Sequence, residues 1–113
     1  MKRTFIYTKV FDKKWSELNL TDDDQMELEN FIMSNPNAGD RIQGTGGAIK
    51  LRWSLPNTGK SGGIRVIYIE LIKAEQIHML TCYPKSDKDN LTDGEKTAIK
   101  EVIKRIISDE SEV

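Results

Sequence analysis

The stretch Ile64–Ile72, "IRVIYIELI", is the strongest structural signal in this chain. All of its nine residues except Arg65 and Glu70 are β-branched, aromatic or leucine. In an extended strand these apolar side chains point to both faces. A strand that is apolar on both faces is buried on both faces, so it lies inside a sheet rather than at its edge. The stretch therefore predicts a central strand with neighbours on either side.

Two further strands flank this stretch in the sequence. "AIKLRWSL" (Ala48–Leu55) alternates between apolar and polar residues, and "QIHMLTCY" (Gln76–Tyr83) is apolar and β-rich. Because short turns join all three, we expect them to pair antiparallel. An earlier stretch, "TFIYTKV" (Thr4–Val10), predicts a first strand.

Helical patterns occupy the rest of the chain. Phe11–Leu18 predicts a short helix. A second helix follows Thr21, an N-cap residue before three aspartates that complement the helix dipole, and ends at Asn35-Pro36. In the last helix Thr92 and Glu95 form a capping box, and the apolar face comprises Ile99, Val102, Ile103, Ile106 and Ile107. The order β-α-α-β-β-β-α predicts an α+β fold, with the helices packed on one sheet.

Composition fits one domain over residues 1–113. Hydrophobic residues make up 37% and charged residues 31%, and no apolar run reaches the ~18 residues of a membrane span. The N-terminus does not fit a signal peptide. The single cysteine, Cys82, excludes an internal disulfide and suits a reducing compartment. We expect a cytoplasmic protein.

Charge is unevenly distributed along the chain. Residues 41–69 contain five basic residues and no acidic one, so with a net charge of −1 the remainder must sum to −6. A near-neutral total thus conceals a basic middle, which favours an anionic partner.

The stretch "SLPNTGKS" (Ser54–Ser61) resembles a phosphate-binding P-loop, with Ser54 where the first glycine should stand. A P-loop needs a following helix, whose N-terminus binds the phosphates. Here the next element is the predicted strand from Ile64 onward. We therefore exclude nucleotide binding of this kind and predict a glycine-rich hairpin connection with Lys60 near its tip.

The hairpin brings cations together. Lys50 and Arg52 are two residues apart on one strand and share a face, and Arg65 begins the returning strand. Cations that converge repel each other unless an anion lies between them, and phosphate suits the arginine fork and the compact lysine charge. We expect this face to bind phosphate.

With these residues assembled, the chain resembles the RelE/HigB family of bacterial toxins, and the HigB-like branch above all. The resemblance is carried by "GDRIQGTGGAIKLRW" (Gly39–Trp53), "GKSGGIRVIYI" (Gly59–Ile69), "IHMLTCYPKSDKDNLT" (Ile77–Thr92) and the closing helix. It implies a microbial-ribonuclease-like fold, in which a curved antiparallel sheet packs against helices on one face. It also implies a ribosome-dependent mRNA endonuclease of a type II toxin–antitoxin pair.

The chemistry that the resemblance implies needs no metal or other cofactor. The ribose 2′-OH attacks the adjacent phosphate and leaves a cyclic phosphate or 3′-phosphate and a free 5′-OH. The implied partners are mRNA in the ribosomal A site, the ribosome and a cognate helix-turn-helix antitoxin, with operator DNA reached only through the antitoxin complex.

Carried over by motif, the resemblance assigns catalytic roles to Arg65, Lys50, Arg52 and Lys85, with Arg65 as the phosphate clamp. It assigns RNA or ribosome contacts to Lys60 and Lys88. The chain departs from the archetypal family pattern at Ala48, Ser86 and Thr92, where lysine, arginine and a base-stacking tyrosine are expected. Base stacking would then fall to Tyr83 or Trp53, and the general base is open.

The only histidine, His78, is mid-strand and reads as a packed or surface side chain, and Cys82 reads as a small buried hydrophobe. A non-catalytic RNA-binding or ribosome-associated module using the same basic face is the alternative function. A protein-interaction domain is the third reading.

Overall fold

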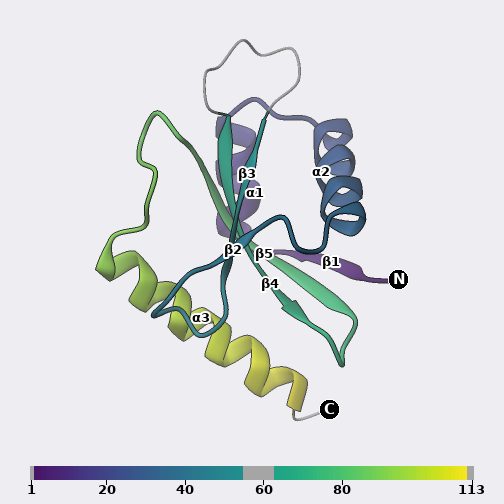
Figure 1. The fold of residues 1–113 in the computed structure, drawn as a ribbon, viewed down its shortest axis with the longest axis vertical. Coiled ribbons are helices and arrows are strands. Elements are labelled where there is room, and N and C mark those ends of the chain that lie inside the picture. The colour runs from purple at the N-terminus through teal and green to yellow at the C-terminus, as the bar shows by residue number, and fades with distance from the viewer. Residues whose placement is uncertain (1, 55–62, 112–113) are drawn as a thin grey trace.

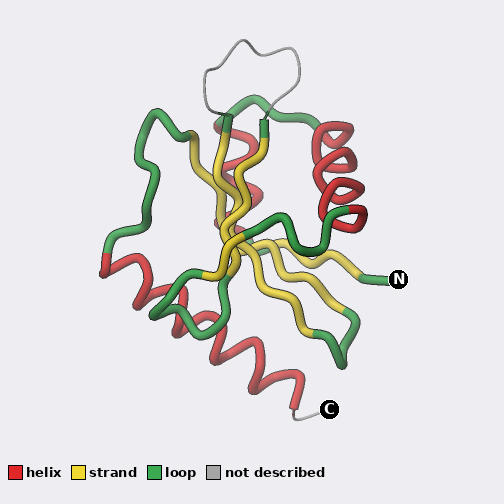
Figure 2. Tube along the Cα trace, viewed as in Figure 1, coloured by secondary structure: helices red, strands yellow, loops and turns green. Residues whose placement is uncertain are grey.

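The computed structural model describes residues 2–54 and 63–111, and within them a five-stranded sheet is combined with three helices (Figures 1 and 2). In chain order the elements are β1 (Thr4–Tyr7), α1 (Lys9–Glu17), α2 (Asp22–Ser34), β2 (Asp40–Arg41), β3 (Ile49–Trp53), β4 (Ile64–Leu71), β5 (Gln76–Pro84) and α3 (Asp93–Ser111). The α+β class predicted from the sequence is confirmed.

The sheet has the order β1-β5-β4-β3-β2, so the apolar strand β4 is central, as its composition predicts. β3, β4 and β5 pair antiparallel through their short connections. The expectation of an antiparallel sheet throughout is wrong at one edge, because β1 pairs parallel with β5. Two helices separate β1 from the rest of the sheet in sequence, and a long connection of this kind permits parallel pairing. The two-residue strand β2 was not predicted; it pairs with β3.

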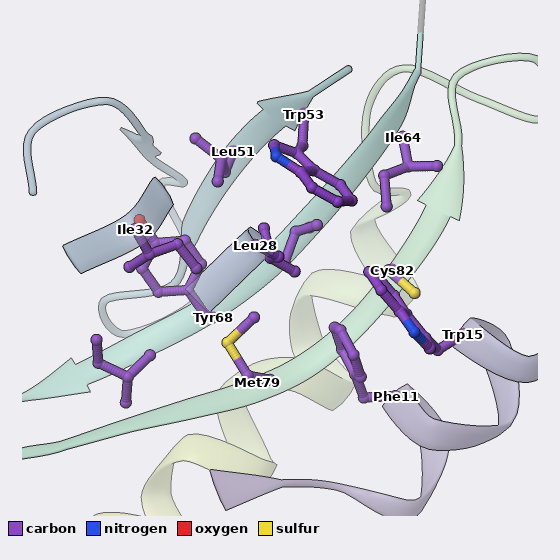
Figure 3. Packing of buried hydrophobic residues seen from close by; sticks show 12 residues of the cluster. Phe11, Trp15, Leu28, Ile32, Leu51, Trp53, Ile64, Tyr68, Met79 and Cys82 are labelled. Carbon is purple, nitrogen blue, oxygen red and sulfur yellow. The ribbon is translucent and has the colours of Figure 1, made fainter. Parts of the chain in front are cut away.

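Helices cover both faces of the sheet, not one as expected. α1 and α2 place Phe11, Trp15, Leu28 and Ile32 in a core with alternate residues of the strands, among them Leu51, Trp53 and Met79 (Figure 3). On the opposite face α3 contributes Ile103 to a second core with Ile67 and Leu80. The reason lies in β4, whose two apolar faces both need a covering layer.

The ends of the elements follow from capping. The first strand stops at Tyr7, three residues before its predicted end, because Thr8 caps α1: its Oγ1 accepts a hydrogen bond from the Phe11 backbone N–H at 3.0 Å. The Thr21 cap is confirmed and forms a capping box with Asp24. The Thr92–Glu95 box is confirmed by bonds of 2.8 and 3.2 Å.

Most of "SLPNTGKS", including Lys60, lies outside the described residues. The element that follows it is the strand β4 and not a helix, as the argument against a P-loop requires. Within residues 2–54 and 63–111, no helix combines the length and the hydrophobicity that a membrane span requires.

Candidate functional site

A row of polar side chains crosses the three central strands on the face that α3 partly covers. In the sheet register Arg52 of β3 lies opposite Arg65 of β4, and Arg65 lies opposite Tyr83 of β5. Lys50 is two residues from Arg52 and so shares its face. The register therefore gathers Lys50, Arg52 and Arg65, as the alternation of residues predicts. Two arginines directly opposite each other repel, so this arrangement needs an anion.

In the structure that anion is Asp89. Both Nε and Nη2 of Arg65 lie 2.9 Å from Asp89 Oδ1. The Arg65 side chain is only 4% exposed, whereas that of Asp89 is 44% exposed. The carboxylate thus lies on the solvent side of the guanidinium. A buried guanidinium without an anionic partner is strongly destabilising, so this ion pair fixes the centre of the site.

Lys50 binds the same short stretch of chain. Its Nζ donates to the carbonyl oxygen of Asp89 at 3.3 Å and to Oδ1 of Asn90 at 3.0 Å. The Tyr83 hydroxyl donates to the same Asp89 carbonyl at 3.4 Å. Lys50, Arg65 and Tyr83 therefore converge on residues 89 and 90, which belong to the connection between β5 and α3.

Arg52 acts on Asp89 through charge. It is exposed, and no hydrogen bond joins it to the carboxylate. The hydrogen bond from Arg65 holds the pKa of Asp89 below its ordinary value, and the charges of Arg65, Lys50 and Arg52 lower it further. Asp89 is therefore ionised at neutral pH, with all three cations acting on it.

Tyr83 and Lys88 form the border of the cluster toward α3. Lys88 Nζ lies 5.0 Å from the centre of the Tyr83 ring, and the same ammonium group pairs with Glu95 in the cap of α3. The pair with Lys88 and the bond from the Thr92 backbone lower the pKa of Glu95. Burial raises the pKa of the Tyr83 phenol, which keeps it a hydrogen-bond donor.

Base stacking on either expected aromatic residue requires rearrangement. Tyr83 is 6% exposed and lies beneath Lys88. Trp53 is 7% exposed and stacks on Trp15 in the core, with ring centres 6.0 Å apart. A base would reach the Tyr83 ring only after Lys88 moved, and the Trp53 ring already serves packing.

The predicted catalytic lysine Lys85 is not bonded to the cluster. Lys85 follows β5, and its backbone N–H donates to the Gly63 carbonyl at 3.2 Å. Its side chain is exposed and makes no hydrogen bond or ion pair with any residue that the structure describes. Lys60 lies outside the described residues, so the structure does not place it.

The family model of the RelE toxin of the RelE/RelB toxin–antitoxin system matches residues 2–112 of the chain. The chain belongs to the RelE toxin family. Membership supports a toxin role with an antitoxin as partner. The match is to the family as a whole, and assignment to its HigB-like branch stays a prediction.

Asp89 is the residue of this RelE-family site that the sequence interpretation missed. The resemblance assigns charged-group roles to cations only. It gives no role to the acidic residues of "KSDKDN" (Lys85–Asn90). One signal was available: Arg65 stands in a strand that is apolar on both faces, and a buried arginine requires an acid. The sequence could not choose between Asp87 and Asp89 for that role.

The sole histidine and the sole cysteine of this RelE-family chain are packed on β5, as expected. His78 is 8% exposed, with Nε2 2.8 Å from Gln76 Oε1, and burial lowers its pKa. Cys82 is buried against α1, and burial raises the pKa of its thiol to about 12. Neither belongs to the Arg65 cluster.

A cavity of about 560 Å³ opens beside the cluster, between α1, β5 and α3. Tyr83 and Lys88 lie on its wall at the end nearest the site, and its lining is mainly apolar, with Leu80, Ile99 and Val102. Among residues 2–54 and 63–111, no group of three or more His, Cys, Asp or Glu side chains is arranged to hold a metal ion.

Proposed function

We propose that this protein is a ribosome-dependent mRNA endonuclease, the toxin of a type II toxin–antitoxin pair. One observation carries the proposal. Arg65, Arg52 and Lys50 share one sheet face, where the almost fully buried Arg65 guanidinium binds the Asp89 carboxylate and the charges of the other two act on the same carboxylate. Such a cluster, in a chain of the RelE family, suits the phosphate of a translated message.

In the proposed reaction the ribose 2′-oxygen attacks the adjacent phosphorus, and the bond from phosphorus to the 5′-oxygen breaks. The 2′-OH loses its proton, and the departing 5′-oxygen gains one. The products are a 2′,3′-cyclic phosphate, which hydrolysis by water opens to a 3′-phosphate, and a free 5′-OH. Arg65 would bind the non-bridging phosphate oxygens, while Lys50 and Arg52 stabilise the charge that develops on them. We assign Lys85 to the same electrostatic role from outside the cluster.

RNA contacts beyond the phosphate fall to Lys60, Lys88 and Tyr83. Of these, Lys88 and Tyr83 border the cluster directly. The proposed partners are the ribosome with mRNA in its A site and a helix-turn-helix antitoxin. Operator DNA is reached only through the complex with that antitoxin. This function places the protein in the cytoplasm, where translated message is found.

An in vitro translation reaction followed by primer extension of the message tests the proposal. Wild-type protein should produce discrete cleavage products. Arg65→Lys keeps a positive charge but loses the two-pronged geometry, and Arg52→Ala removes a charge without disturbing the core. Each should slow cleavage by roughly 100- to 1000-fold, the usual effect of losing one transition-state donor.

Arg105→Ala, an exposed arginine on α3, is the matched control and should cleave like wild type. Circular dichroism confirms that each variant is folded. If folded wild-type protein leaves translated message intact but binds RNA with steep salt dependence, the enzyme proposal is wrong and the chain is the non-catalytic RNA-binding module.

A further inference from the structure

The cation cluster is already occupied by the protein itself. Asp89 places its carboxylate on Arg65 with two contacts of 2.9 Å, and Lys50 bonds the carbonyl of the same residue at 3.3 Å. Three of the four cations that the proposed function assigns to the phosphate, namely Arg65, Lys50 and Arg52, lower the pKa of Asp89. The site is therefore filled in the free protein, by a group that the function does not use.

A carboxylate and a phosphodiester are chemically interchangeable at such a position. Each carries one negative charge, and each offers two oxygen atoms that accept hydrogen bonds from an arginine fork. Exchange of one for the other keeps the local charge constant. Arg65, with 4% of its side chain exposed, would keep an anionic partner throughout, which a buried guanidinium requires.

The N–H edge of Arg65 formed by Nε and Nη2 cannot bind both anions at once. Asp89 lies between the guanidinium and solvent, since its side chain is 44% exposed and the guanidinium is almost covered. A phosphate that approaches from solvent meets this carboxylate first, and two like charges at one small site repel. Access for RNA therefore requires Asp89 to leave.

The connection between β5 and α3 is anchored so that this displacement is local. On one side of Asp89 the Lys85 backbone bonds Gly63 at 3.2 Å and Lys88 pairs with Glu95. On the other side Thr92 and Glu95 form the cap of α3. The side-chain contacts that hold residues 89 and 90 go instead to Arg65, Lys50 and Tyr83. Two of these three residues are ones to which the RNA phosphate would itself bind.

We propose, on the basis of the proposed function, that Asp89 is a built-in competitor that occupies the phosphate position in the free protein and must be displaced before RNA is cleaved. The apparent affinity for RNA is then the intrinsic affinity multiplied by the fraction of molecules from which Asp89 has moved away. Competition by Asp89 makes the free toxin a weak binder of RNA outside the ribosome. Full engagement would need the additional contacts that a message in the ribosome supplies.

Asp89→Asn tests the competition, because it keeps the size of the side chain and removes its charge. The probes are inorganic phosphate and a short RNA with a 2′-deoxyribose at the cleavage position, so that no cleavage intervenes. We expect Asp89→Asn to bind both about tenfold more tightly, since the competing arrangement loses its charge-assisted bonds. Asp89→Ser should show the same direction of change.

Asp87→Asn is the matched control. It removes the same charge from the same connection, and Asp87 is exposed. Its effect on phosphate affinity should stay below about twofold, because solvent screens exposed charges. Thermal unfolding shows whether each variant is folded. If folded Asp89→Asn and Asp89→Ser bind phosphate no better than wild type, the role of Asp89 is only structural and the proposal is overturned.

Cleavage in the translation reaction provides a second readout. A displaced competitor takes no part in the chemistry, so Asp89→Asn should cleave at least as fast as wild type. Loss of cleavage in the folded variant would overturn the proposal, because it would give Asp89 a part in the reaction itself. If Asp89→Asn binds phosphate more tightly while wild type and variant both leave message uncut, the competition stands and the endonuclease function fails.

Discussion

At the scale of single residues, burial decides what each ionisable group can do. Arg65 is 3% exposed, so it always needs an anion, and this need ties the position of Asp89 to the state of the site. Arg52, directly opposite in the sheet, is exposed to water. The two arginines therefore differ: Arg65 is held in place by burial and by Asp89, whereas the exposed Arg52 side chain is free to reorient toward a ligand.

Burial also controls the chemistry of Cys82. Burial raises the pKa of its thiol to about 12, so the reactive thiolate is nearly absent at pH 8. We expect the native protein to resist a chromogenic thiol reagent at pH 8, and to react fully once it is unfolded in denaturant. The rate of colour development with and without denaturant measures this. Native-state modification as fast as that of a free cysteine would contradict the burial of Cys82.

At the scale of elements, the β3–β4 pair sets the geometry of the site. Its register places Arg52 opposite Arg65, and it begins where Trp53 pairs with Ile64. Gly63 precedes that pair with φ of +62°, in the left-handed region that favours glycine. A Cβ at this position would collide with the carbonyl oxygen of Trp53 and lie 3.0 Å from the Ser54 Cα. The close approach of two backbones therefore fixes the start of the hairpin ladder.

Gly63→Ala should destabilise the fold by about 2 kcal/mol or more, because both the dihedral angle and the backbone contact oppose a side chain. Gly94→Ala is the control: a Cβ there meets nothing within 4 Å, and in α3 alanine is favoured over glycine by up to about 1 kcal/mol. Urea denaturation measures both. Equal stability of Gly63→Ala and wild type would refute the close approach of β4 to Trp53.

At the scale of the whole molecule, charge is separated between the two faces of the sheet. The face that carries Lys50, Arg52 and Arg65 is partly covered by α3, and the other face is covered by α1 and α2. The three aspartates in the first turn of α2 belong to that second layer. A net charge of −1 therefore describes neither face, and RNA would meet a locally basic surface.

Binding of the non-cleavable RNA should accordingly weaken steeply with salt in spite of the near-neutral total. For single-stranded RNA each ion pair contributes about −0.7 to the slope of log K against log salt concentration. We expect Arg52→Ala to reduce the magnitude of the slope by about that amount and Arg105→Ala to leave it unchanged. Fluorescence anisotropy over a range of salt concentrations measures it. An identical slope for Arg52→Ala and wild type would exclude Arg52 from phosphate binding.

Much of the architecture could be predicted because the signals are local. The alternation in "AIKLRWSL", the apolar run of β4 and the caps at Thr21 and Thr92 each depend on neighbours within a few residues. The parallel pairing of β1 and the placement of helices on both faces escaped prediction. They depend on contacts between segments far apart in the chain. A periodic pattern shows which face of an element is apolar, but it does not show which other element packs against that face.

The candidate site divides in the same way. Local pattern is enough to predict the central strand and the shared face of Lys50 and Arg52, because side chains in a strand alternate with a period of two. The occupation of the cluster by Asp89, twenty-four residues after Arg65, is visible only in the folded molecule. An ion pair across that separation depends on where the connection after β5 passes over the sheet, and no local periodicity encodes that path.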